Sequence, residues 1–336
     1  MDATEIEQAY RRIRPLVRKT PLVRSEGLSN LVRGDVYLKL ENEQLSGSFK
    51  VRGALQLMAT LTEEQKIRGV IAPTAGNHGM GLAYAGKAAG VPVHIYLPET
   101  ADASKVTYMQ DHGAHVSYFR DIETARQAAL QDAAEQALCF VSAYNNPQMV
   151  RGAGTVALEV LEELPDLETV LVNTGGGGLT AGMGLYLKAK HPPAKLIAVQ
   201  PENSPTFAAW FREGKVCEVA LRPSIAEGLS GFIDPATLTF PLFLKVVDQV
   251  VTVTEQEIAA AMRWLLKEQK IVAEPSGVAA LAALLSGKVK VAGKVAVTVT
   301  GGNISPERFH RLLKAQPLAS APVDAVLKGV TTKQGS

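Results

Sequence analysis

Short apolar runs alternate with segments of helical spacing along almost the whole chain. Between residues 69 and 145 the apolar runs are GVIAP, VPVHIYLP, AHVSYF and LCFVSAY, and each is typical of a strand. The segments between them carry apolar residues at helical intervals. Because parallel strands need a crossover connection, this alternation predicts an α/β fold built on parallel sheets.

The order of the runs predicts two doubly wound parallel-sheet domains, one inserted into the other. We expect residues 61–146 to form a small domain. Residues 1–60 and 147–317 would form a large domain that includes the strand VYLKLE. A chain of 336 residues is long enough for two cores. Residues 318–336 show no pattern and are expected to form a flexible tail.

Charge and composition exclude several classes of partner. The net charge is +2, with acids and bases interspersed, which favours neither nucleic acid nor a membrane surface. No apolar run is long enough to span a bilayer, and the charged N-terminal segment is not typical of a secretory signal. Cys139 and Cys217 stand far apart, which indicates neither a disulfide framework nor a zinc site. We therefore expect a cytoplasmic protein.

Four consecutive glycines, Gly175, Gly176, Gly177 and Gly178, follow a predicted strand and begin a helix. Glycines allow the main chain to approach an anion closely, and the N–H groups at a helix N-terminus attract negative charge. A phosphate is the natural ligand, with a plain flexible turn as the alternative. No Lys-Ser/Thr pair follows, so the run is not a nucleoside-triphosphate P-loop.

A dinucleotide site is a second alternative for the same glycines. Gly175 and Gly177 follow one strand, and Glu202 follows the next, where an acid could bind a ribose. Thr180 occupies the third glycine position of that fingerprint, which weakens the match. A nicotinamide-dependent dehydrogenase therefore stays open as an alternative.

Lys50 follows a Ser-Gly turn and stands at the start of a predicted helix. The positive end of a helix disfavours the charged amine, and Schiff-base chemistry requires a neutral amine. By itself a lysine is more often a solvated surface charge.

Residues 74–79 begin another helix after a strand and offer main-chain N–H groups for a carboxylate. A simple helix cap is the alternative role for Asn77.

In order along residues 5–315, several segments resemble fold-type II (tryptophan synthase β-like) pyridoxal-phosphate enzymes of the serine/threonine dehydratase and serine racemase family. These segments are LENEQLSGSFKVRGA, TAGNHGMGLAYAGKAAG, GGGGLTAG, SIAEGLSG, AEPSGVAALAAL and TGGN. The resemblance implies pyridoxal 5'-phosphate as cofactor, bound in the cleft between the two domains.

The resemblance also implies a role for individual residues. Lys50 is the implied catalytic residue, which holds the cofactor and then acts as the base at the substrate Cα. The residues implied to bind or border the cofactor are Phe49, Lys50, Asn77, Gly175, Gly176, Gly177, Gly178, Leu179, Gly228, Glu274 and Thr300. Those implied to bind the substrate carboxylate are Thr74, Ala75 through its N–H, Asn77 and His78.

Departures from the family pattern refine the expected chemistry. Ala75 replaces the serine that racemases use as acid and base, and a methyl group cannot deliver a proton. Gln200 and Thr206 stand where the family has acidic ligands for a divalent cation, so we predict no required metal. Thr300 keeps a hydroxyl where the resemblance implies a partner for the pyridine nitrogen. A neutral partner leaves that nitrogen unprotonated and favours β-elimination.

Together these features predict a pyridoxal-phosphate-dependent ammonia-lyase (dehydratase). Its substrate would be a hydroxy amino acid, L-threonine or L-serine first, converted to a 2-keto acid and ammonia. The alternatives are a 3-hydroxyaspartate dehydratase, an amino-acid racemase, another β-elimination or replacement enzyme, the dehydrogenase, and a non-catalytic relative. By analogy we expect a homodimer or homotetramer. The sequence leaves the preferred substrate open.

Overall fold

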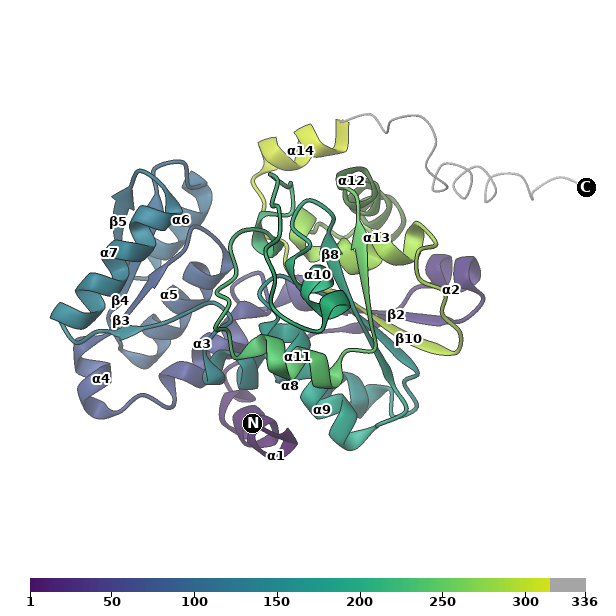
Figure 1. The fold of residues 1–336 in the computed structure, drawn as a ribbon, viewed down its shortest axis with the longest axis horizontal. Coiled ribbons are helices and arrows are strands. Elements are labelled where there is room, and N and C mark those ends of the chain that lie inside the picture. The colour runs from purple at the N-terminus through teal and green to yellow at the C-terminus, as the bar shows by residue number, and fades with distance from the viewer. Residues whose placement is uncertain (315–336) are drawn as a thin grey trace, which may run out of the picture.

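The computed structural model describes residues 1–314 and contains two sheets (Figure 1). The large sheet has the order β1 (Leu22–Arg24), β2 (Asp35–Leu40), β10 (Lys294–Val299), β7 (Thr169–Asn173), β8 (Lys195–Pro201) and β9 (Gln249–Val253). The small sheet has the order β5 (His115–Phe119), β4 (Val93–Pro98), β3 (Val70–Pro73) and β6 (Cys139–Phe140). The predicted α/β class with two parallel sheets is confirmed. The antiparallel edge strand β1 was not predicted.

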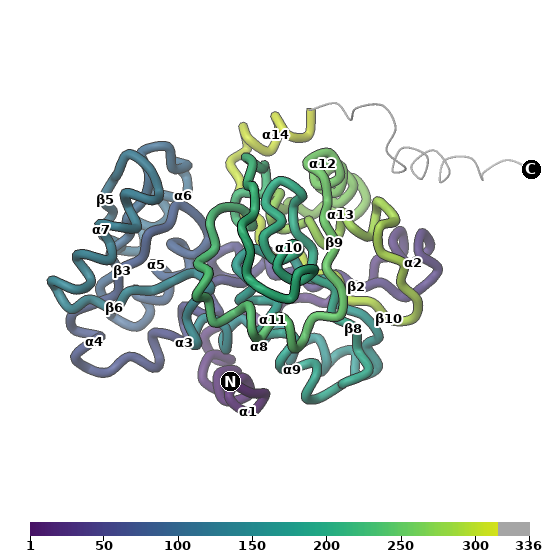
Figure 2. The backbone as a smooth tube through the Cα atoms, viewed as in Figure 1, coloured from purple at the N-terminus to yellow at the C-terminus, as the bar shows by residue number. Residues whose placement is uncertain are grey.

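Helices surround both sheets. Those that precede the four strands of the small sheet in turn are α4 (Glu63–Arg68), α5 (Asn77–Ala89), α6 (Ala103–Asp111) and α7 (Ile122–Glu135). The others are α1 (Ala3–Ile13), α2 (Glu26–Val32), α3 (Lys50–Met58), α8 (Pro147–Glu163), α9 (Gly178–Lys190), α10 (Thr206–Glu213), α11 (Thr239–Val246), α12 (Glu255–Trp264), α13 (Ala279–Leu285) and α14 (Pro306–Lys314). Figures 1 and 2 show the small sheet with α4–α7 on the left and the large sheet on the right, with α3 where they meet.

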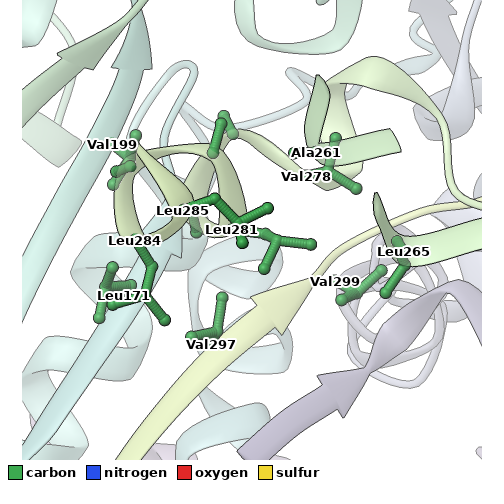
Figure 3. Close-up of a cluster of buried hydrophobic side chains, with 14 of the residues drawn as sticks. Leu171, Val199, Ala261, Leu265, Val278, Leu281, Leu284, Leu285, Val297 and Val299 are labelled. Carbon is green, nitrogen blue, oxygen red and sulfur yellow. The ribbon is translucent and has the colours of Figure 1, made fainter. Parts of the chain in front are cut away.

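The large sheet is buried on both faces, which explains why its strands are continuous apolar runs. Successive residues of β7 enter opposite cores: Leu171 packs with α12 and α13, whereas Val170 and Val172 pack with α8, α9 and α11. Figure 3 shows the first of these cores, in which Leu171 lies below Leu284 of α13. Burial on both faces holds the carboxyl ends of the parallel strands in fixed positions.

Glycines let four helices approach one another closely across the middle of the molecule. A β-carbon on Gly81 of α5 would lie 3.1 Å from the main chain of α3, and one on Gly152 of α8 would lie 2.4 Å from the other side of α3. A β-carbon on Gly182 of α9 would lie 2.3 Å from the main chain of α8. Main-chain contacts therefore connect α5, α3, α8 and α9 in a row.

A fully buried ion cluster anchors α3. The guanidinium of Arg52 donates to both carboxylate oxygens of Glu41 at 2.7 and 2.8 Å, and to both of Glu159 at 2.7 and 2.8 Å. Lys39 Nζ donates to Glu159 at 2.7 Å. All four side chains are fully buried. Two cations and two anions balance, so β2, α8 and the first turn of α3 are connected by a neutral network.

The strand predicted from LCFVSAY is wrong in length. β6 ends at Phe140, and residues 142–145 leave the sheet to line a cavity.

Apolar residues of α3, including Val51 and Leu55, pack in the core of the small sheet, although we predicted residues 1–60 as part of the large domain. The domain boundaries stay a prediction. The predicted tail at 318–336 lies outside the described residues. Within residues 1–314, no helix combines the length and apolar character needed to cross a bilayer.

The substitution Arg52→Met should lower the free energy of unfolding by about 3–5 kcal/mol, because it leaves two buried carboxylates short of a cation. Urea denaturation measures this loss. The control is Arg68→Ala, which breaks the exposed pair with Glu64 and should cost about 0–1 kcal/mol. Equal losses in the two variants would contradict a structural role for the cluster.

Candidate active site

A cavity of about 670 Å³ is bounded by loops from both sheets. It lies at the carboxyl ends of parallel strands, because segments that follow β3, β7 and β10 all contribute to its wall. The predicted site residues that line it are Phe49, Lys50, Thr74, Ala75, Asn77, His78, Gly175, Gly176, Gly177, Gly178, Leu179, Gly228, Glu274 and Thr300. Every predicted site residue therefore borders one space.

Lys50 is the first residue of α3, and its amine reaches the cavity wall. Nζ donates to the carbonyl oxygen of Ala143 at 3.0 Å and lies 5.1 Å from the centroid of the Phe49 ring. The main-chain N–H of Phe49 donates a hydrogen bond to Thr300 O at 3.2 Å. Burial of the amine lowers the pKa of Lys50 to about 8. The neutral amine that attacks an aldehyde is therefore a larger fraction near physiological pH than for an ordinary lysine.

The glycine run forms a concave loop at the start of α9. Gly177 has φ +78°, a left-handed conformation that favours glycine. A β-carbon on Gly176 would lie 2.3 Å from Cγ of Tyr144, so no side chain fits there. The first N–H groups of α9 have no partner within the helix and carry its positive dipole end. The loop has the shape and polarity to bind a phosphate group.

The N-terminus of α5 forms the opposite part of the wall. The helix has Gly76 as its N-cap, and no side chain caps it, so the alternative of Asn77 as a cap is wrong. Instead, Asn77 donates to the Glu274 carboxylate and accepts from Asn303 Nδ2 at 2.7 Å. These contacts fix the Asn77 amide while the first-turn N–H groups of α5 stay available for an anion.

The imidazole of His78 contacts the main chain just after β6. Its Nε2 lies 3.1 Å from Val141 O, and its Nδ1 is buried without a partner. Burial, then the charge of Lys50, lowers the pKa of His78 to about 3, so the ring is neutral. With Nε2–H donating to Val141, a carboxylate would be bound by the His78 main-chain N–H.

Thr300 is held by a residue that sequence reasoning missed. Asn173, at the end of β7, donates through Nδ2 to Thr300 Oγ1 at 3.1 Å and accepts from Ala280 N at 2.6 Å. The Thr300 hydroxyl therefore accepts from the amide, and its own hydrogen is directed toward Ser276 O at 3.4 Å. An asparagine that ends a buried apolar strand was the signal available in the sequence.

Glu274 lies beside this wall and also contacts the small sheet. Its carboxylate is 3.7 Å from the Nζ of Lys105, which lies in the first turn of α6 and also lines the cavity. Burial raises the pKa of Glu274, and Lys105 and Asn77 oppose that shift. Gly228 donates from its N–H to Ser276 Oγ at 2.8 Å. Lys105 and Ser276 were not predicted, because only the fold brings them to the site.

The acid expected for a dinucleotide site and the residues at the family's cation position lie outside the cavity wall. Glu202 is exposed and does not line the cavity, so it offers no acid for a ribose there. Gln200 is buried, and its Oε1 accepts from Ala208 N at 2.9 Å. Residues 1–314 contain no cluster of three or more His, Cys, Asp or Glu side chains arranged to hold a metal ion. The absence of a required metal stays a prediction.

Known proteins match most of the chain. Residues 13–301 match the family described as pyridoxal-phosphate dependent enzyme. An L-threonine ammonia-lyase of Thermotoga maritima is 41% identical over 311 residues, covering 92% of this chain and 77% of the relative. A catabolic L-threonine dehydratase of Staphylococcus aureus is 37% identical over 316 residues, covering 92% and 91%. The solved structure of maize serine racemase has a TM-score of 0.88 at 32% identity, covering 92% and 96%.

The low pKa of Lys50 has a kinetic consequence. The rate at which the amine forms a Schiff base with added pyridoxal phosphate should rise through about pH 8, because the neutral form appears there. An ordinary lysine amine, with a pKa of about 10.4, reacts in the same way only at higher pH. Stopped-flow absorbance against pH measures the midpoint. Nα-acetyl-lysine, whose side-chain amine is free, is the control. A midpoint near pH 10 for the protein would contradict the described environment.

Proposed function

The chain belongs to the pyridoxal-phosphate dependent enzyme family, and we propose that it is an ammonia-lyase that dehydrates L-threonine or L-serine. One observation carries the proposal: a lysine amine with a lowered pKa, a glycine loop fit for phosphate and an anion-binding helix N-terminus face one cavity. Both relatives reported above carry the names of threonine lyases, which supports this substrate class.

The residues present fit pyridoxal 5'-phosphate. Lys50 offers an amine for the aldehyde, and residues 175–178 with the N–H of Leu179 offer a cradle in which a side chain on Gly176 would not fit. Thr300 offers a neutral hydroxyl for the ring nitrogen. When bound, the cofactor supplies an electron sink for the electron pair left at the substrate Cα.

The side chains of this protein then divide the work of elimination. The first-turn N–H groups of α5 and the Thr74 hydroxyl orient the substrate carboxylate. The Lys50 amine takes the proton from Cα, and in the overall balance that proton and the β-hydroxyl leave together as water. The enamine that remains hydrolyses in solution to the 2-keto acid and ammonia. Ala75 has no proton to give at Cα, so elimination is favoured over racemisation.

Three finer points belong to the proposal. We propose threonine or serine as the substrate. The alternatives to be assayed beside them are 3-hydroxyaspartate and other substrates of β-elimination. We propose a homo-oligomer, by analogy with related enzymes. We also propose a cytoplasmic location, which suits the two free cysteines Cys139 and Cys217.

The substitution Lys50→Ala should reduce keto acid formation from L-threonine and L-serine by at least about 1000-fold, because it removes the base at Cα. A coupled assay for keto acid and ammonia measures this, and chiral analysis of the remaining amino acid tests for racemisation. The matched control is Lys66→Ala on α4, which removes a lysine paired with Glu63 and should keep wild-type activity. Normal turnover by Lys50→Ala would overturn the proposal.

Removal of divalent cations should leave kcat and KM unchanged. Gln200 and Thr206 are neutral, and the Gln200 side-chain oxygen already accepts a main-chain N–H. Dialysis against EDTA followed by assay with and without added magnesium or calcium makes the measurement. Activity that disappears on dialysis and returns with a cation would show that this prediction is wrong.

A further inference from the structure

The segment of residues 142–146, which joins β6 to α8, contacts three parts of the site. Ala143 O accepts the hydrogen bond from Lys50 Nζ at 3.0 Å. The ring of Tyr144 lies against Gly176 in the phosphate cradle. Asn145 Oδ1 accepts from Leu238 N at 2.9 Å. One short connection therefore reaches the reactive amine, the cradle and a loop of the large sheet.

That loop, residues 231–238, is named here the substrate loop because its first half lines the cavity. Gly231 has φ +112°, and Phe232 is 66% exposed at the cavity wall. Ile233 is buried in the core beneath, and Thr237 near the other end of the loop is buried as well, so the loop is anchored at two points. The next residue, Asp234, donates its main-chain N–H to the Tyr144 hydroxyl at 3.0 Å.

Tyr144 thus contacts the cradle with its ring and the substrate loop with its hydroxyl. A β-carbon on Gly176 would lie 2.3 Å from Tyr144 Cγ, and one on Gly178 would lie 3.4 Å from Tyr144 Cβ. The backbone on which the ring lies is therefore the backbone that would surround a phosphate. Burial raises the pKa of the Tyr144 phenol, so the hydroxyl is neutral and its oxygen accepts the Asp234 bond at physiological pH.

We propose that Tyr144 is a positioning residue that couples occupancy of the phosphate cradle to order in the substrate loop. A phosphate bound by residues 175–178 fixes the backbone under the ring, and the ring fixes the Asp234 N–H. The inference rests on the proposed function, because the phosphate belongs to pyridoxal phosphate. The far end of the loop has a separate link to the cradle, because Thr239 Oγ1 donates to Gly176 O at 2.8 Å and is hydrogen-bonded to Thr237. Tyr144 provides the link at Asp234.

Amide hydrogen exchange at Asp234, with and without pyridoxal phosphate, tests the coupling. In the wild type the cofactor should slow this exchange. The substitution Tyr144→Phe keeps the ring and removes the hydroxyl, so protection by the cofactor should be lost while the affinity for pyridoxal phosphate is retained. With a neutral hydrogen bond removed, KM for L-threonine should rise about fivefold and kcat should change little.

Two further variants sharpen the result. Asn145→Ala removes only the bond to Leu238 and should keep cofactor-dependent protection at Asp234. Tyr118→Phe removes an exposed hydroxyl on β5, outside the cavity, and should match the wild type throughout. Loss of protection in Asn145→Ala as complete as in Tyr144→Phe would count against a specific role for Tyr144.

The outcomes separate this inference from the proposed function. If the wild type forms no Schiff base with pyridoxal phosphate, the proposed function fails. If the cofactor binds to both proteins and protects Asp234 equally in the wild type and in Tyr144→Phe, the function stands and the coupling through Tyr144 is overturned.

Discussion

The guanidinium of Arg52 holds two buried carboxylates at once, and the position of the reactive amine depends on it. Charges that are fully buried are tolerated only when each is paired and hydrogen-bonded, and this cluster meets that condition with Lys39 completing the balance. Because Arg52 lies two residues after Lys50 on the same helix, the network that satisfies its charge also fixes where α3 begins. The ion cluster does not line the cavity, but it helps to fix the position of the Lys50 amine that does.

Most of the fold follows from apolar periodicity, and its exceptions have physical causes. Strands β3, β4 and β5 and strands β7 to β10 are long enough to give clear apolar runs. β1 has three residues and a partly exposed pattern, so only its pairing with β2 identifies it. The run after Phe140 predicted a longer strand because Val141 is buried and its N–H still donates to Ile71 O of β3 at 2.9 Å, although β6 has ended.

The site was predictable in its parts and less so in its connections. Parallel strands end at one edge, so the segments after β3, β7 and β10 were expected to meet, and they line one cavity. Asn173 and Tyr144 act through contacts with segments far away in the sequence, which no local pattern reports. His78 illustrates a related limit, since its motif placed the residue at the site but did not show that its side chain contacts Val141 O.

The row of glycine contacts through α5, α3, α8 and α9 has a thermal consequence. Side chains between helices can change rotamers on heating, and the helices can then drift apart in small steps. Contacts between main-chain atoms offer no such intermediate states. The spacing between Lys50 and the glycine cradle at the start of α9 should therefore stay nearly constant as temperature rises, until the helices separate cooperatively.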